Sequence, residues 1–130
     1  MIFKNYSESA ALLAQKIKEN FGNNFSLTFI NSESEAFAKK VAENLGVDLI
    51  ESINPQNLII VDNGSTVAVE YNEFTDEIRK THPTTNIIIA IPIIPESEKE
   101  TLSQNCDTLL YLHTDPYFFS LDQFYKQHSF

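Results

Sequence analysis

Residues 58–70 constrain the fold of this chain more than any other stretch. The apolar run from Leu58 to Val61 ends in an acid, an amide and a glycine, and a helical pattern of apolar residues follows. A short apolar run bounded by turn residues is typical of a strand that is buried on both faces of a parallel sheet. In open α/β sheets, ligands bind at the edge where such strands end. The stretch therefore predicts a buried strand that leads into a ligand-side turn and then a helix.

The same alternation of strand and helix patterns extends over the whole chain. Strands are expected at residues 26–30, 47–53, 58–61, 86–91 and 108–112. Helices are expected at residues 7–20, between a turn at 31–34 and Gly46, and at 66–80, 96–104 and 122–126. This order predicts an α/β fold of three layers, with a mainly parallel, twisted sheet, right-handed crossovers and helices on both faces.

A few residues mark where these elements should end. Ser7 is expected to cap the first helix, and Gly22 and Gly46 are expected to end the first and second helices. Pro92 and Pro95 are expected to flank the turn that follows the most apolar strand.

Length and charge limit the classes of function. A chain of 130 residues predicts one domain, residues 1–130. The chain has 18 acidic and 9 basic residues, which gives a net charge of −9. We therefore expect neither nucleic acid nor an anionic membrane as a partner.

Cys106 is the only cysteine, which rules out a disulfide within the chain. No stretch has the pattern of a signal peptide or a membrane helix, and we expect a cytoplasmic protein.

Several segments, taken in their order along the chain, resemble a type I phosphoribosyltransferase of the small bacterial kind. The resemblance spans most of the chain, including the strand, turn and Ala-rich helix of residues 27–45. The other matching segments are Val61-Asp62-Asn63-Gly64, Ile91-Pro92-Ile93-Ile94-Pro95, Cys106-Asp107-Thr108-Leu109-Leu110, Pro116-Tyr117-Phe118-Phe119 and Phe124-Tyr125. The resemblance implies the phosphoribosyltransferase fold. It also implies the family's reaction, in which a nitrogen nucleophile displaces pyrophosphate from magnesium-bound phosphoribosyl pyrophosphate.

The resemblance also implies a phosphoribosyl loop, but the loop departs from the family pattern. Two acids should hold the ribose hydroxyls. Asp62 matches the first acid, whereas Asn63 stands in place of the second and brings no negative charge to a developing oxocarbenium ion. We expect any ligand contacts from what remains of this loop. The candidate residues are Asp62, Asn63, Gly64, Ser65 and Thr66.

The parts of the family site that hold phosphate and pyrophosphate are altered further. The family places Thr-Gly-x-Thr where this chain has residues 67–70, and Glu70 replaces the last hydroxyl. The pyrophosphate turn corresponds to residues 31–35, where Glu33 and Glu35 would oppose a polyanion. About ten residues separate Gly46 from Leu58, too few for the family's hood and lid. These changes predict a degenerate site.

Each residue of the loop also has a structural interpretation. Asp62 is either a ribose ligand or a cap of the next helix, and Ser65 and Thr66 are either phosphate ligands or caps. Asn63 and Gly64 suit a tight turn whatever the function.

The sequence therefore favours a non-catalytic domain of the phosphoribosyltransferase fold that acts as a binding or interaction module, with no catalytic residue and no metal site. One alternative is a weakly active phosphoribosyltransferase that uses Asp62, Ser65 and Thr66, and needs magnesium only with phosphoribosyl pyrophosphate. The other is a regulator that senses a nucleotide or nucleoside. A small phosphorylated ligand is doubtful in an acidic chain.

The aromatic C-terminal segment offers a further possibility. Its aromatic residues are Tyr117, Phe118, Phe119, Phe124, Tyr125 and Phe130. Packing of this segment on the core is the first expectation, and the alternative is a surface for a homodimer or a protein partner. Cys106 is expected to be a buried structural thiol, and His113 is the histidine placed nearest to the ligand edge.

Overall fold

The computed structural model describes residues 2–49, 56–64, 66 and 68–130. In this part of the chain, helices and strands alternate as the sequence predicts. The elements are α1 (Tyr6–Phe21), β1 (Ser26–Phe29), α2 (Ser32–Leu45), β2 (Asn57–Val61), α3 (Ala68–Thr81), β3 (Asn86–Pro95), η1 (Glu96–Glu98), α4 (Lys99–Gln104), β4 (Thr108–Asp115) and η2 (Leu121–Phe124), where η denotes a 3₁₀-helix. The helices described here include none that is long and apolar enough to cross a membrane.

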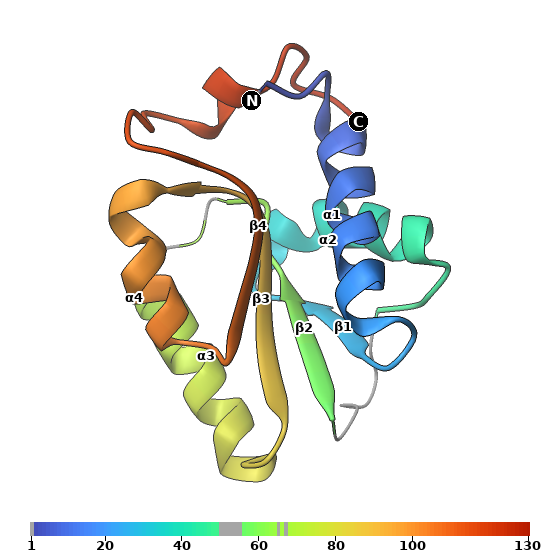
Figure 1. Ribbon diagram of the computed structural model, residues 1–130, viewed down its shortest axis with the longest axis vertical. Coiled ribbons are helices and arrows are strands. Elements are labelled where there is room, and N and C mark those ends of the chain that lie inside the picture. The colour runs from blue at the N-terminus through green and yellow to red at the C-terminus, as the bar shows by residue number, and fades with distance from the viewer. Residues whose placement is uncertain (1, 50–55, 65, 67) are drawn as a thin grey trace.

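The four strands form a parallel sheet in the order β1-β2-β3-β4. Helices α1 and α2 cover one face of the sheet, and α3 and α4 cover the other (Figure 1). The strand residues alternate between the two faces: Ile59 and Val61 pack under α1 and α2, whereas Leu58 and Ile60 pack under α3 and α4. The predicted three-layer α/β fold is confirmed.

The connections between strands use both faces of the sheet. Helices α3 and α4 lie on the same face and lead to successive neighbouring strands, so the β2–α3–β3 and β3–α4–β4 connections have the same hand. The chain from β1 to β2 passes through α2 on the other face and then through residues 50–55, which lie outside the described part. Because α2 lies on the other face and the step from β1 to β2 runs the same way across the sheet, this connection does not share the hand of the other two, contrary to the prediction of right-handed crossovers throughout.

Helices α1 and α2 begin at asparagine caps that the sequence analysis did not predict. The Asn5 side chain accepts a hydrogen bond from the Glu8 N–H and caps α1, so the cap is Asn5 and not Ser7. Asn31 caps α2 in the same way, and residues 32–34 form the first turn of the helix rather than a free turn. An amide oxygen accepts such a bond as well as a hydroxyl does.

Strand β3 continues through Pro92 to Pro95, where a turn was predicted. The Asp62 N–H donates to the Ala90 carbonyl, so Ala90 faces β2, and Pro92, two residues later, faces the same side. Pairing with β2 ends at Val61 and Ala90, so no neighbouring strand requires an N–H from Pro92. On its other side β3 pairs with β4 as far as Asp115, and β4 is correspondingly longer than predicted.

The two ends of the chain pack together at the carboxyl edge of the sheet. Phe3 forms an isolated parallel bridge with Tyr125, and its N–H donates to the Phe124 carbonyl at 2.7 Å. The predicted helix at 122–126 is instead the 3₁₀-helix η2, because Tyr125 is extended to make this bridge. Residues 47–49 of the predicted strand at 47–53 are not in a strand, and residues 50–53 lie outside the described part of the chain.

Candidate functional site

Asp62 lies at the end of β2 and is fully buried. Its Oδ1 accepts hydrogen bonds from Ser34 Oγ at 3.0 Å and from the Gly64 N–H at 3.0 Å. Its Oδ2 accepts a hydrogen bond from the hydroxyl of Tyr71 on α3. Both oxygens of this carboxylate are therefore occupied by groups of the protein itself.

Tyr71 is one of the largest fully buried side chains, and its hydroxyl lies against this carboxylate. Burial is the main reason that the pKa of Tyr71 is raised well above its ordinary value, and the negative charge of Asp62 adds to the effect. The phenol therefore keeps its proton and remains a donor.

Gly64 lies beneath Leu121 of the C-terminal segment. Its φ is +108°, and a Cβ built there would lie 2.6 Å from Leu121 Cδ2 and 3.3 Å from the Ile93 carbonyl oxygen. Glycine is therefore required by the backbone conformation, and a methyl group there would also force the Leu121 side chain to move. The turn that the sequence analysis assigned to a ligand is covered by η2.

The loops that would hold phosphate and pyrophosphate are joined to each other. Asn31 Nδ2 donates to Thr66 Oγ1 at 3.1 Å and to Glu70 Oε2 at 3.0 Å. Thr66 is buried, and its hydroxyl is engaged by this amide. Ser65 and Val67 lie outside the described residues. The asparagine that caps α2 thus also closes the space between the ends of β1 and β2.

The acids named in the sequence analysis lie in the first turns of two helices. Glu33 and Glu35 occupy the first turn of α2, and Glu70 occupies the first turn of α3. Glu33 and Glu70 are exposed. They put negative charge at two helix N-termini, where a phosphate would otherwise find favourable amides.

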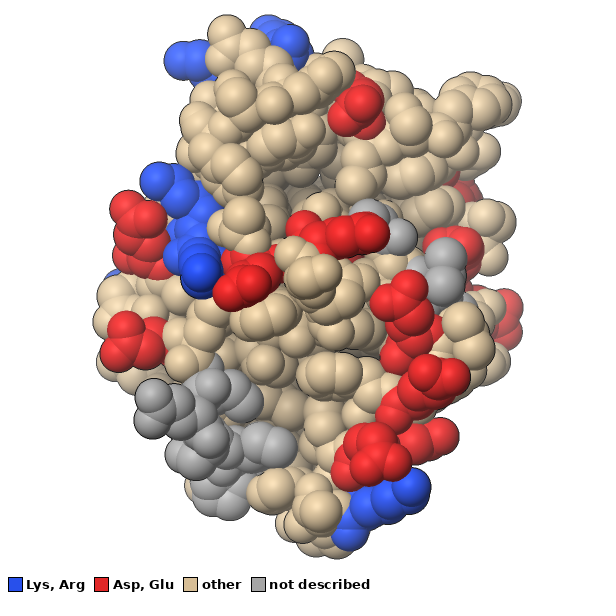
Figure 2. Space-filling view, turned by 180° about the vertical axis from the view of Figure 1, so that it is seen from behind, with Lys and Arg blue, Asp and Glu red and all other residues tan. Residues whose placement is uncertain are grey.

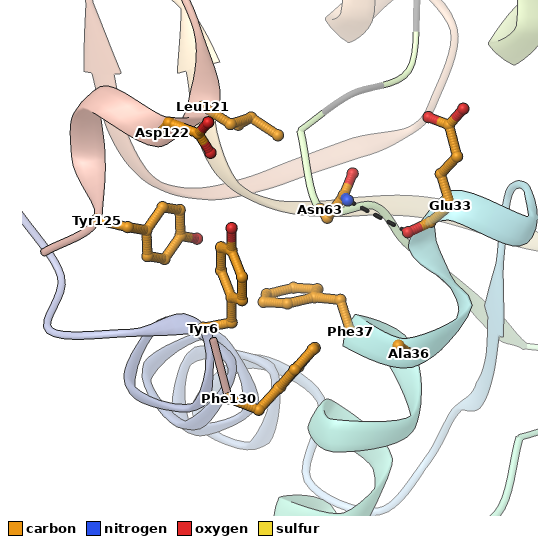
Figure 3. Close-up of a pocket in the computed structure, with 9 residues that line it drawn as sticks. All are labelled: Tyr6, Glu33, Ala36, Phe37, Asn63, Leu121, Asp122, Tyr125 and Phe130. Atoms are coloured by element: carbon orange, nitrogen blue, oxygen red, sulfur yellow. Dashed lines mark hydrogen bonds between the residues drawn. The ribbon is translucent and has the colours of Figure 1, made fainter. Parts of the chain in front are cut away.

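A pocket of about 230 Å³ opens beside this loop, between α1, α2 and the C-terminal segment (Figure 3). Its wall contains the rings of Tyr6, Phe37, Tyr125 and Phe130, and the Asn63 side chain projects at one side. Asn63 Nδ2 donates to the Glu33 carbonyl at 3.3 Å, which ties this side of the pocket to α2. The tyrosines pack edge to face, with ring centroids 4.6 Å apart.

Other candidate residues have structural roles. Cys106 is partly buried, and burial raises the pKa of its thiol to about 11, which makes it a poor nucleophile. His113 contacts the Asp115 carboxylate at 3.3 Å and packs against the Phe124 ring. Across the described residues, no three His, Cys, Asp or Glu side chains are grouped closely enough to hold a metal ion.

The sheet, its two helical layers and the loop after β2 define a phosphoribosyltransferase-like fold, and solved structures agree. Orotate phosphoribosyltransferase from Aeropyrum pernix matches 81% of this chain and 68% of its own, with a TM-score of 0.59 and 12% identity. The protein TT1426 from Thermus thermophilus matches 96% of this chain and 90% of its own, with a TM-score of 0.65 and 11% identity. A hypoxanthine-guanine-xanthine phosphoribosyltransferase matches 82% and 74%, with a TM-score of 0.55 and 9% identity.

The likeness is one of fold. No model of a known protein family matches the sequence, and no curated protein matches it. The resemblance to phosphoribosyltransferases is therefore confirmed in the three-dimensional structure, at identities that show the fold alone.

Asp62, Asn63, Gly64 and Thr66 follow one another in the loop after β2, and their role as ligand contacts stays a prediction. The structure adds Tyr71 to this group. Tyr71 lies on the helix predicted at residues 66–80 and is fully buried. Its bond to Asp62 was missed, although a buried phenol needs a hydrogen-bond partner and Asp62 lies one strand-to-helix turn earlier. The pocket was missed because its walls come from both ends of the chain.

Proposed function

We propose that this protein is a non-catalytic member of the phosphoribosyltransferase fold that acts by binding, with its ancestral phosphoribosyl loop used as structure. The observation that carries the proposal is the burial of Asp62 beneath Tyr71. This carboxylate is fully buried, and both of its oxygens already accept hydrogen bonds from the protein, namely from Ser34, Gly64 and Tyr71.

The hydrogen bonds of Asp62 argue against its release to bind a substrate. Releasing Asp62 would break three hydrogen bonds, and hydrogen bonds to a charged group contribute about 1.5–3 kcal/mol each. Removing Tyr71 from the position that a ribose would take also means moving a fully buried side chain in the first half of α3. The binding of a substrate here would have to offset the free energy of breaking these hydrogen bonds and of moving Tyr71 before any reaction could occur.

The charges beside the loop support the same proposal. Glu33 and Glu70 stand at the starts of α2 and α3, which are the positions that a pyrophosphate and a phosphate would need. Two like charges about 4 Å apart cost about 1 kcal/mol in water and more in a drier pocket. A polyanion would meet repulsion at both helix ends.

A thermal unfolding assay tests the proposal. We expect no change in the melting temperature when magnesium and phosphoribosyl pyrophosphate are added at millimolar concentration, with an active phosphoribosyltransferase in the same buffer as the positive control. A ligand at 100 times its dissociation constant would stabilise the folded state by about 2.7 kcal/mol. A shift of that size would contradict the loss of the phosphate site, and release of pyrophosphate with an added base would contradict the whole proposal.

A further inference from the structure

Strand β4 forms an open edge of the sheet. It is the last strand in the order β1-β2-β3-β4, and β3 is its partner among the described strands. Helices α1 and α4 stand on either side of this edge (Figure 1). The residues of β4 are half-buried, apart from the buried Leu110. An extended segment of another chain can pair with such an edge through its main chain.

The main chain of β4 presents donors and acceptors at this edge. The Tyr111 carbonyl faces outward, where it accepts a hydrogen bond from Lys16 Nζ on α1 at 2.6 Å. The N–H and C=O groups of successive strand residues point to opposite sides, so Leu109 and His113 also direct theirs outward, while the residues between them bond to β3. Within the described part of the chain, no strand pairs with these outward groups.

Two lysines reach this edge from the two helices. Lys16 Nζ on α1 lies 5.4 Å from the centroid of the Tyr111 ring, and Lys99 Nζ on α4 lies 5.1 Å from it. The ion pairs within the described residues join acids to other cations and include neither Lys16 nor Lys99. Both ammonium groups can therefore pair with a carboxylate that arrives at the edge.

The distribution of charge indicates the sign of the partner. On the side of the molecule seen from behind, away from β4, acidic side chains make up most of the charged surface (Figure 2). The Debye length at physiological salt is about 8 Å, so those acids act weakly at the β4 edge, whereas Lys16 and Lys99 lie beside it. A basic segment would bring like charge to both lysines, and an acidic segment would be attracted to them.

We propose that the β4 edge binds an extended, acidic segment of a partner protein as an added strand, with two adjacent acidic side chains paired to Lys16 and Lys99. Successive side chains of a strand point to opposite faces of a sheet, so one acid would turn toward α1 and the next toward α4. An N–H of the segment replaces Lys16 as the donor to the Tyr111 carbonyl, which releases Lys16 for the first acid.

This inference deepens the proposed function and rests on it, since it names the class of partner for the binding module. The edge is separate from the phosphoribosyl loop, because β3 lies between β4 and the strand that leads into that loop. The two proposals can therefore be tested independently.

Three peptides of one length test the charge of the partner, by titration into isotope-labelled protein followed by NMR. The probes are acetyl-Thr-Val-Glu-Glu-Val-Thr-amide and the same peptide with Gln-Gln or Lys-Lys at its centre. At low ionic strength we expect the Glu-Glu peptide to bind about three- to tenfold more tightly than the Gln-Gln peptide, the range suited to two solvent-accessible ion pairs. We expect the Lys-Lys peptide to bind most weakly, and added salt to reduce these differences.

The backbone amide signals of β4 test the added strand itself. The N–H groups of Leu109, Tyr111 and His113 face the open edge and should shift on titration with the Glu-Glu peptide. Those of Leu110 and Leu112 bond to β3 and should shift much less. Attraction of a peptide to the lysines alone would not produce this alternation. Equal shifts along β4, or no shifts there, would overturn the proposal.

Replacing Lys16 separates recruitment of the partner from protection of the edge, since a lysine at a sheet edge can also prevent pairing. Lys16→Gln should weaken binding of the Glu-Glu peptide about two- to fivefold. Tighter binding would show that Lys16 closes the edge, and would overturn the proposal. The matched control is Lys18→Gln, which removes the same charge from another side of α1 and should leave binding unchanged.

The remaining outcomes are equally decisive. Equal binding of the Glu-Glu and Gln-Gln peptides, or no binding at concentrations on the order of 10 mM, would overturn the acidic partner. The same alternating shifts on raising the protein concentration without peptide would overturn it in favour of a second copy of this chain. None of these results bears on the phosphoribosyl pyrophosphate assay, in which a shift in melting temperature would instead remove the non-catalytic claim.

Discussion

At the scale of single residues, the proposed function depends most on Asp62. Its identity matches the ribose-binding acid of an enzyme, but its environment is that of a structural carboxylate. The difference comes from Tyr71 and Ser34, whose hydroxyls donate to this carboxylate from α3 and α2. A buried carboxylate needs hydrogen-bond donors for both of its oxygens, and the Tyr71 phenol supplies the donor for Oδ2.

Replacing Tyr71 with phenylalanine should therefore destabilise the protein. Tyr71→Phe keeps the ring and removes the donor from Asp62 Oδ2, so we expect the free energy of unfolding to fall by about 1–3 kcal/mol. Urea denaturation measures the change. Tyr117→Phe is the control, because Tyr117 is 72% exposed and its hydroxyl should contribute less than about 0.5 kcal/mol. Equal stability of both variants would show that Asp62 does not need the phenol.

Cys106 makes stability depend on alkaline pH. Burial raises the pKa of its thiol from 9.0 to about 11, so the folded state retains a proton that the unfolded chain loses between these values. The contribution is complete below pH 9 and is lost as the pH rises toward 11. We expect the denaturation midpoint to fall between about pH 8 and about pH 10.5, by less in Cys106→Ala than in the wild type. Parallel falls in both proteins would contradict this role.

At the scale of elements, Asn31 does more than start a helix. Its Oδ1 caps α2, while its Nδ2 binds Thr66 and Glu70 across the gap between the ends of β1 and β2. The sequence analysis read residues 31–34 as a turn and residues 66–70 as a separate loop. The amide that joins them could not be predicted, because it depends on the distance between two neighbouring strand ends.

The two roles of Asn31 can be separated by comparison with the other cap. Asn5→Ala removes a cap alone and should cost about 1 kcal/mol of stability. Asn31→Ala removes a cap and two further hydrogen bonds, and should cost about 2 kcal/mol or more. Asn31→Asp keeps the cap but places a carboxylate beside Glu70, so its stability should rise with added salt. If Asn31→Ala costs no more than Asn5→Ala, the bridge contributes nothing to stability.

At the scale of the whole molecule, the two ends of the chain cover the edge at which ligands of this fold bind. Phe3, Phe124 and Tyr125 form a small buried cluster with Ile93, and Leu121 rests on Gly64. Part of the aromatic segment therefore packs on the core as expected. Tyr117 and Phe119 remain exposed, and the predicted homodimer or protein surface at this segment stays a prediction.

The contribution of the contact between Leu121 and Gly64 to the free energy of unfolding can be measured. Gly64→Ala adds a methyl group at a φ of +108° and 2.6 Å from Leu121, so we expect a loss of about 2–5 kcal/mol from backbone strain and overlap together. Adding Leu121→Ala should recover part of that loss. Gly46→Ala is the control, because nothing lies within 4 Å of its Cβ position; its effect should be additive with Leu121→Ala in a denaturation cycle. Additivity at Gly64 as well would contradict the contact.

The sequence alone determined the layered α/β fold and the alternation of the four strands with helices α1 to α4, although residues 47–49 are not in the strand predicted there and 122–126 is not the predicted helix. These follow from local patterns, because an apolar run such as Ile87 to Ile91 can be buried only inside a layered fold. Only the tertiary structure decided how the loop after β2 is used. Tyr71, Asn31 and Leu121 reach the loop from three different elements, and each contact depends on a distance between segments that no local pattern encodes.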